Sequence, residues 1–144
     1  MKQFNWNWDE TTEWLPILDA YICSRLVEPD TNALEIGVWK GGWIFTIAEN
    51  NLEVKLYGVD PYPNLLHVKN SFLIQVNQRA LTDRVSLFES LSELRDSIES
   101  DCLFQLIHVD GEHTEEAVER DLDLPTVSEP ESLLVRGCCS TTLL

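Results

Sequence analysis

Glycine and acidic residues early in the chain are spaced as they are in sites that bind a nucleotide-like cofactor. The segment Asn-Ala-Leu-Glu-Ile-Gly-Val-Trp-Lys-Gly-Gly covers residues 32–42, and Asp60 ends a second apolar segment. Residues 33–36 suit a buried strand, and the glycines that follow allow the backbone to turn tightly beside a ligand. An acidic residue about 20 positions later is placed to bind ribose hydroxyls. We therefore predict a cofactor site between Gly37 and Asp60.

Two residues of this turn narrow the choice of ligand. A dinucleotide fingerprint has glycine at the second position of G-x-G-x-x-G, where the backbone approaches a pyrophosphate, and Trp39 stands there instead. Glu35 adds a carboxylate two positions before the first glycine, which would repel phosphate but attract an ammonium and a sulfonium. This pattern favours S-adenosylmethionine as the cofactor.

A second group of reactive residues follows the apolar segment at 103–109. Asp110 ends this segment, at a position where a carboxylate can bind a divalent ion or face a substrate. His113 could accept a proton from a hydroxyl at neutral pH, or it could simply orient the backbone of its loop. His67 and His108 have no comparable setting, and we assign them no function.

Short apolar segments alternate with helical patterns, which is typical of an α/β fold with a mainly parallel sheet. After a leading helix at about 11–26, strands are expected at 33–36, 54–59, 85–88, 103–109 and 132–135. Helices between them are expected at about 42–50, 65–76, 90–100 and 114–124. We treat residues 1–144 as a single domain with its core at about 32–136.

These segments resemble class I S-adenosylmethionine-dependent methyltransferases, in the branch with Glu-Ile-Gly-x-x-x-Gly-Gly and Val-Asp-Gly-x-His motifs. The resemblance covers residues 34–123 and implies a Rossmann-like sheet of order 3-2-1-4-5. It implies that Glu35, Gly37 and Gly41 surround the methionine part of the cofactor and that Asp60 binds the ribose.

The resemblance also places Glu89 and Ser90 beside the adenine. Ser90, however, begins a Ser-x-x-Glu capping box with Glu93, in which the serine and the glutamate each bind a free backbone N–H group. Both roles are kept as alternatives for Ser90, and the capping role is favoured.

The chain departs from the family pattern in three places. Trp43 and Ile44 replace the serine or threonine that usually begins the helix after the glycines. Arg-Gly-Cys-Cys at 136–139 replaces the acidic pair of metal-using relatives, so no bound metal is expected. The family sheet ends in an antiparallel hairpin, and since the sequence stops at Leu144, we expect that hairpin to be missing from a shortened C-terminus.

Composition restricts the range of partners. The formal net charge of −15 over 144 residues would repel nucleic acid and anionic membranes, so neither is expected. No apolar segment is long enough to cross a bilayer and the N-terminus lacks a secretory signal pattern, so we predict a cytoplasmic protein. The 4 cysteines have no metal-site spacing and are expected to be reduced.

The leading functional hypothesis is methylation of a hydroxyl on a small molecule. One alternative is a domain that binds S-adenosylmethionine but has lost turnover, and a weaker one is a nicotinamide-dependent oxidoreductase. The sequence leaves the methyl acceptor and the oligomeric state open, although an exposed fifth strand would favour a homo-oligomer.

Overall fold

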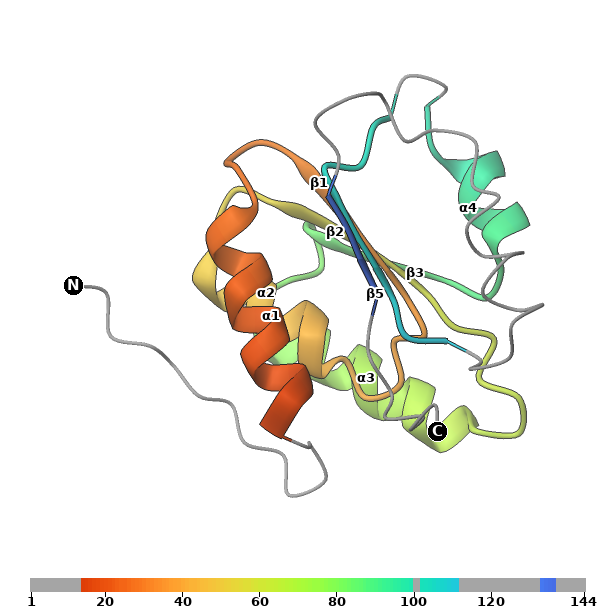
Figure 1. Ribbon diagram of the computed structural model, residues 1–144. Helices are drawn as coiled ribbons and strands as arrows, with labels where there is room; N and C mark the ends of the chain where they lie inside the picture. The colour runs from red at the N-terminus through yellow and green to blue at the C-terminus, as the bar shows by residue number, and fades with distance from the viewer. Residues whose placement is uncertain (1–13, 100–101, 112–132, 137–144) are drawn as a thin grey trace, which may run out of the picture.

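The computed structural model describes residues 14–99, 102–111 and 133–136, and its centre is a five-stranded parallel sheet (Figure 1). The strand order is β3-β2-β1-β4-β5, and all neighbouring strands are parallel. The strands are β1 (Asn32–Ile36), β2 (Lys55–Val59), β3 (Val85–Phe88), β4 (Leu106–Val109) and β5 (Leu133–Arg136). The strand order predicted from the sequence is confirmed.

Helices cover both faces of the sheet. They are α1 (Trp14–Leu26), α2 (Gly42–Asn50), α3 (Leu66–Gln78) and α4 (Leu91–Ser97). Figure 1 shows α1, α2 and α3 on one face and α4 on the other. The helix predicted at about 114–124 lies outside the described residues. None of the helices in the described part of the chain has the length and apolar character needed to cross a membrane.

Two apolar cores form because side chains alternate between the faces of each strand. On the side of α1, α2 and α3, Ala33 packs with Ile44. On the side of α4, Leu34 and Ile107 pack with Leu94. Every residue of β4 is buried, as predicted for a strand covered on both faces.

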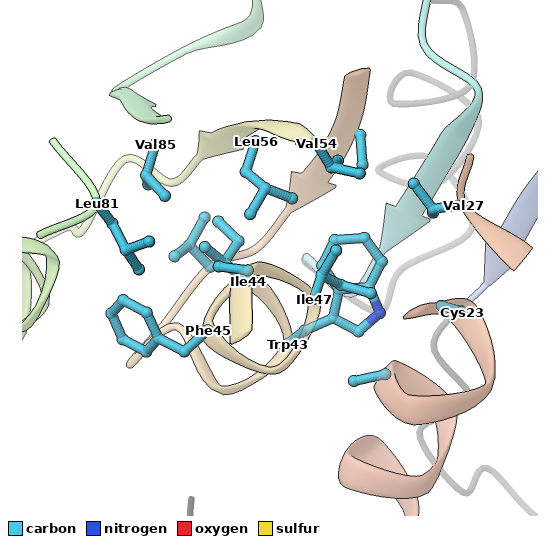
Figure 2. Packing of buried hydrophobic residues seen from close by; sticks show 14 of the residues in the cluster. Cys23, Val27, Trp43, Ile44, Phe45, Ile47, Val54, Leu56, Leu81 and Val85 are labelled. Atoms are coloured by element: carbon cyan, nitrogen blue, oxygen red, sulfur yellow. The ribbon is translucent and has the colours of Figure 1, made fainter. Parts of the chain in front are cut away.

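Helix α2 is fixed at both its sheet-facing side and its C-terminal end. Figure 2 shows Ile44 turned toward Leu56 of β2 within the larger core. At the other end, the Arg84 guanidinium donates hydrogen bonds of 3.2 Å to the carbonyl oxygens of Ala48 and Val54. The last carbonyls of a helix lack partners within it, so Arg84 satisfies one of them and holds the helix in place.

The fourth strand begins at Leu106, later than the residue 103 predicted from the apolar pattern. The Leu103 carbonyl accepts a hydrogen bond of 2.9 Å from the Asn32 side chain. The Gln105 side chain accepts a backbone N–H from the α1–β1 connection at 2.8 Å. Side-chain bonds thus hold this segment, and backbone pairing with β1 starts only where the Gln105 amide donates to the Asn32 carbonyl oxygen at 3.0 Å.

Candidate cofactor-binding site

The predicted cofactor residues meet at the carboxyl ends of three neighbouring strands. The Gly37 amide donates to the carbonyl of Val59, the last residue of β2, at 2.8 Å. The Asp110 amide donates to Ile36, the last residue of β1, also at 2.8 Å. Gly37, Asp60 and Asp110 therefore lie at one edge of the sheet, where ligands bind in open α/β folds.

The glycine loop, defined here as residues 37–42, passes too close to its neighbours to carry side chains at two positions. A Cβ on Gly37 would lie 2.2 Å from the Asp110 carbonyl oxygen, and the Gly37 φ is +91°. A Cβ on Gly41 would lie 2.5 Å from the Phe72 ring, and the Gly41 φ is +82°. Both positions therefore require glycine, for steric and for conformational reasons.

The Asp60 carboxylate is bound to backbone amides on both of its oxygens. Trp39 N–H donates to Oδ2 and Tyr62 N–H donates to Oδ1, each at 2.8 Å. A carboxylate oxygen can accept more than one hydrogen bond, so each oxygen can still receive a ligand hydroxyl. The arrangement fixes the direction of the carboxylate, and ribose binding by Asp60 stays a prediction.

Trp39 and Tyr62 both adopt left-handed backbone conformations, with φ values of +50° and +44°. Such values are uncommon for bulky residues and persist only where neighbouring groups enforce them. The Trp39 side chain is 50% exposed at the glycine loop, whereas Tyr62 is buried.

Glu35 lies in the interior rather than on an open surface. It is in register with Gly58 of β2 and His108 of β4, and its side chain is on the face covered by α2. His108 Nδ1 lies 3.3 Å from Glu35 Oε1. The other oxygen, Oε2, is buried and has no hydrogen-bond partner among the described residues. The buried Glu35 carboxyl, two residues before the glycine loop, is therefore only partly satisfied.

Trp43 completes this buried polar cluster. Its indole stacks on the His108 imidazole with ring centroids 4.9 Å apart and planes 5° apart. The Trp43 Nε1 is buried and, within the part of the chain that the structure describes, unpartnered. Trp43, at the position where the resemblance leads one to expect serine or threonine, thus packs on the imidazole that faces Glu35.

Burial raises the pKa of Glu35 from 4.5 to about 7. The hydrogen bond and charge of His108 and the backbone amide of Ile44 oppose this increase, whereas the negative charge of Asp110 adds to it. The protonation of the carboxyl group therefore changes close to neutral pH.

Of the two predicted catalytic residues, Asp110 is partly exposed beside Gly37 at the end of β4. His113 lies outside the described residues, so the pairing of Asp110 with His113 stays a prediction. No cluster of three or more His, Cys, Asp or Glu side chains suited to a metal occurs in residues 14–99, 102–111 and 133–136.

Ser90 caps α4 as predicted. Its Oγ accepts the Glu93 amide at 3.1 Å, and Glu93 Oε2 accepts the Glu89 amide at 2.7 Å. The Glu89 carboxylate forms an ion pair with Lys69, which lowers the Glu89 pKa. A contact of Glu89 or Ser90 with adenine stays a prediction.

Three residues of the site were not identified from the sequence as functional: Tyr62, Trp43 and His108. Tyr62 stands between two prolines and was assigned only to a turn. His108 was assigned no function, although a polar residue within an otherwise apolar buried strand usually has a buried partner. That partner, Glu35, is also the only acidic residue of its strand.

Comparison with protein families identifies a model described as Methyltransferase domain, which matches residues 34–130. Comparison with curated protein sequences gives no match.

Solved structures of methyltransferases share the fold. The O-methyltransferase TomG from Streptomyces achromogenes, in complex with S-adenosylmethionine, is 15% identical with a TM-score of 0.64, over 84% of this chain and 53% of that chain. A Podospora anserina methyltransferase with bound S-adenosylhomocysteine is 16% identical with a TM-score of 0.55, over 84% of this chain and 61% of that one. Coclaurine N-methyltransferase, bound to N-methylheliamine and S-adenosylhomocysteine, is 17% identical with a TM-score of 0.60, over 90% of this chain and 38% of that chain.

The chain thus spans between 38% and 61% of the lengths of these structures, and at such identities the likeness concerns the fold alone. The family match is independent of them and covers more than half of the sequence, from residue 34 to residue 130. The protein therefore belongs to the methyltransferase domain family.

Proposed function

We propose that the protein binds S-adenosylmethionine against the glycine loop and transfers its methyl group to a hydroxyl of a small molecule. The observation that carries the proposal is the meeting of Gly37, Asp60 and Asp110 at one sheet edge in a chain of this family. Three methyltransferases of related fold that bind S-adenosylmethionine or S-adenosylhomocysteine in their solved structures support the choice of cofactor.

The residues of the chain fit this cofactor. Gly37 and Gly41 allow the tight turn that brings the loop against Asp110 and Phe72, and the fixed Asp60 carboxylate can accept two ribose hydroxyls. The Glu35 carboxyl lies buried two residues before the loop, and when ionised its negative charge favours the ammonium of the methionine part.

S-adenosylmethionine, when bound, supplies a methyl group activated by a sulfonium. The chain contributes binding and orientation, which account for much of the acceleration of a displacement reaction. Asp110 faces the same sheet edge, and we assign to Asp110 and His113 the role of accepting the proton of the acceptor hydroxyl.

The test is calorimetric titration of the purified chain with S-adenosylmethionine and with S-adenosylhomocysteine, beside NAD as the control ligand. We expect saturable binding of the first two and none of NAD. Absence of binding by both sulfur ligands would refute the proposal, and binding of NAD alone would favour the oxidoreductase alternative.

Turnover is a separate question. Transfer of labelled methyl groups to a panel of hydroxyl-bearing acceptors distinguishes an active enzyme from a domain that only binds the cofactor. Cofactor binding without methyl transfer to any acceptor would support the alternative of a domain that binds S-adenosylmethionine but has lost turnover.

A further inference from the structure

Tyr62 joins the two loops that border the predicted ribose site. Its hydroxyl donates to the Trp39 carbonyl oxygen at 2.7 Å, and its backbone amide donates to Asp60 Oδ1 at 2.8 Å. Asp60 Oδ2 in turn accepts the Trp39 amide. The peptide groups on both sides of Trp39 are therefore bound, one by the carboxylate and the other by the phenol.

The Tyr62 side chain is suited to this task. It is 5% exposed, so water competes little for its hydroxyl. Burial raises the pKa of Tyr62, and the negative charges of Asp60 and Glu35 add to the increase. The hydroxyl consequently stays protonated at any physiological pH and remains a donor to the Trp39 carbonyl.

The backbone conformation of Trp39 indicates what the Tyr62 hydroxyl stabilises. Trp39 has a φ of +50°, a conformation that an L residue with a large side chain adopts only when its surroundings impose it. Without the Tyr62 bond, the Trp39 carbonyl would lose the partner that opposes a return to an ordinary conformation. That return would also move the Trp39 amide away from Asp60.

We infer that Tyr62 is a positioning residue for cofactor binding: through Trp39 and Asp60 it holds the carboxylate in the direction that receives the ribose hydroxyls. The inference rests on the proposed function. Fixing these groups before the ligand arrives lowers the entropy lost on binding, which is the usual benefit of a preorganised site.

The test uses Tyr62→Phe, which removes only the hydroxyl, and Tyr57→Phe as the matched control. Tyr57 lies in the middle of β2 on the α4 side of the sheet, against Phe88 and Phe104. Calorimetry should show a dissociation constant for S-adenosylhomocysteine about five- to tenfold higher in Tyr62→Phe, the effect of one lost hydrogen bond. The Tyr57→Phe value should stay within about twofold of the original chain.

A ligand that lacks the ribose 2′-hydroxyl distinguishes an effect of Tyr62 on the position of Asp60 from a general loss of order in the two loops. If Tyr62 acts through Asp60, its removal should weaken S-adenosylhomocysteine more than the 2′-deoxy analogue, because the analogue has already lost a hydroxyl that Asp60 receives. Hydrogen exchange of the Trp39 amide should also accelerate in Tyr62→Phe, since its bond to Asp60 would be less populated.

Equal weakening of the two ligands, or an unchanged dissociation constant in Tyr62→Phe, would overturn the inference while leaving the proposed function intact. Failure of the original chain to bind either sulfur ligand would instead refute the proposed function, and with it the role of Tyr62.

Discussion

His108 and Glu35 face each other on neighbouring strands, with Nδ1 and Oε1 separated by 3.3 Å in a fully buried setting. The Glu35 pKa of about 7 makes the stability of the fold depend on pH. Between pH 4.5 and about 7 the folded state keeps the proton that the unfolded state releases, so the free energy of unfolding should fall as pH rises through this range. The full change is about 3 kcal/mol.

Glu35→Gln should remove most of this pH dependence, because glutamine does not ionise. Urea denaturation at several pH values between about 5 and 8 measures the slope. Glu53→Gln, at an exposed position, is the control and should leave the slope unchanged. An identical slope in Glu35→Gln and the original chain would show that another group causes the dependence.

His108→Ala should lower the free energy of unfolding by about 3 kcal/mol. The variant loses the stack on Trp43 and leaves a cavity, and it also leaves the Glu35 carboxyl without its hydrogen-bond partner. His67→Ala is the matched control, since His67 is exposed on α3, and its effect should stay below about 0.5 kcal/mol. Similar denaturation midpoints for the two variants would contradict the importance of the buried pair.

Gly37→Ala should be the most damaging single change in the glycine loop. The added Cβ would lie 2.2 Å from the Asp110 carbonyl oxygen at a φ of +91°, so the ends of β1 and β4 must move apart. We expect a loss of stability above about 2 kcal/mol and cofactor affinity reduced more than tenfold.

Gly42→Ala provides the comparison for that variant. Gly42 is exposed in the first turn of α2, where alanine suits the helix better than glycine. Its stability should be unchanged or slightly higher by thermal denaturation. Equal tolerance of the two substitutions would mean that the close contact between Gly37 and Asp110 does not exist in solution.

Ser90→Ala tests the two roles assigned to Ser90. Loss of the cap on Glu93 should cost about 1 kcal/mol, with affinity for S-adenosylhomocysteine changed by less than about twofold. Ser92→Ala, an exposed position within the same helix, should leave both quantities nearly unchanged. A large loss of affinity at unchanged stability would instead support a contact between Ser90 and the adenine.

The positions of the strands could be predicted because each strand carries its own local signal, whereas their order was implied by the resemblance to the methyltransferases. The apolar segment before Gly37, the acidic residue at position 60 and the capping box at Ser90 mark element ends within a few residues. The capping box depends only on neighbours three and four positions apart: the Ser90 cap is as predicted, whereas the Glu93 carboxylate accepts the N–H of Glu89 in place of that of Ser90.

The buried polar cluster could not be predicted because it depends on strand register. Glu35 and His108 become neighbours only when β1 and β4 pair with a particular alignment, and a shift by one residue would place them on opposite faces. For the same reason the pattern that placed Glu35 near the cofactor gave no sign that its carboxyl would be buried against an imidazole.

The backbone conformation of Trp39 could not be predicted from the sequence either. The sequence showed only that a glycine expected there was replaced, which disfavoured a pyrophosphate but said nothing about the conformation adopted. The left-handed φ of Trp39 is accompanied by a hydrogen bond that its amide donates to Asp60 and one that its carbonyl accepts from Tyr62, and both partners follow the next helix and strand in the sequence.

The pairing of β1 with β4 also determines when the site can form during folding. Glu35 and His108 are 73 residues apart in the chain, whereas β1 and β2 are joined by a single helix. Contacts that close long loops are slow to form, so the β1–β2 unit can assemble well before β4 is in place. During synthesis, residues as far as Asp110 must leave the ribosome before Gly37 of the glycine loop can pack against the Asp110 backbone. A cofactor that binds only after this contact has formed can stabilise only the late stages of folding.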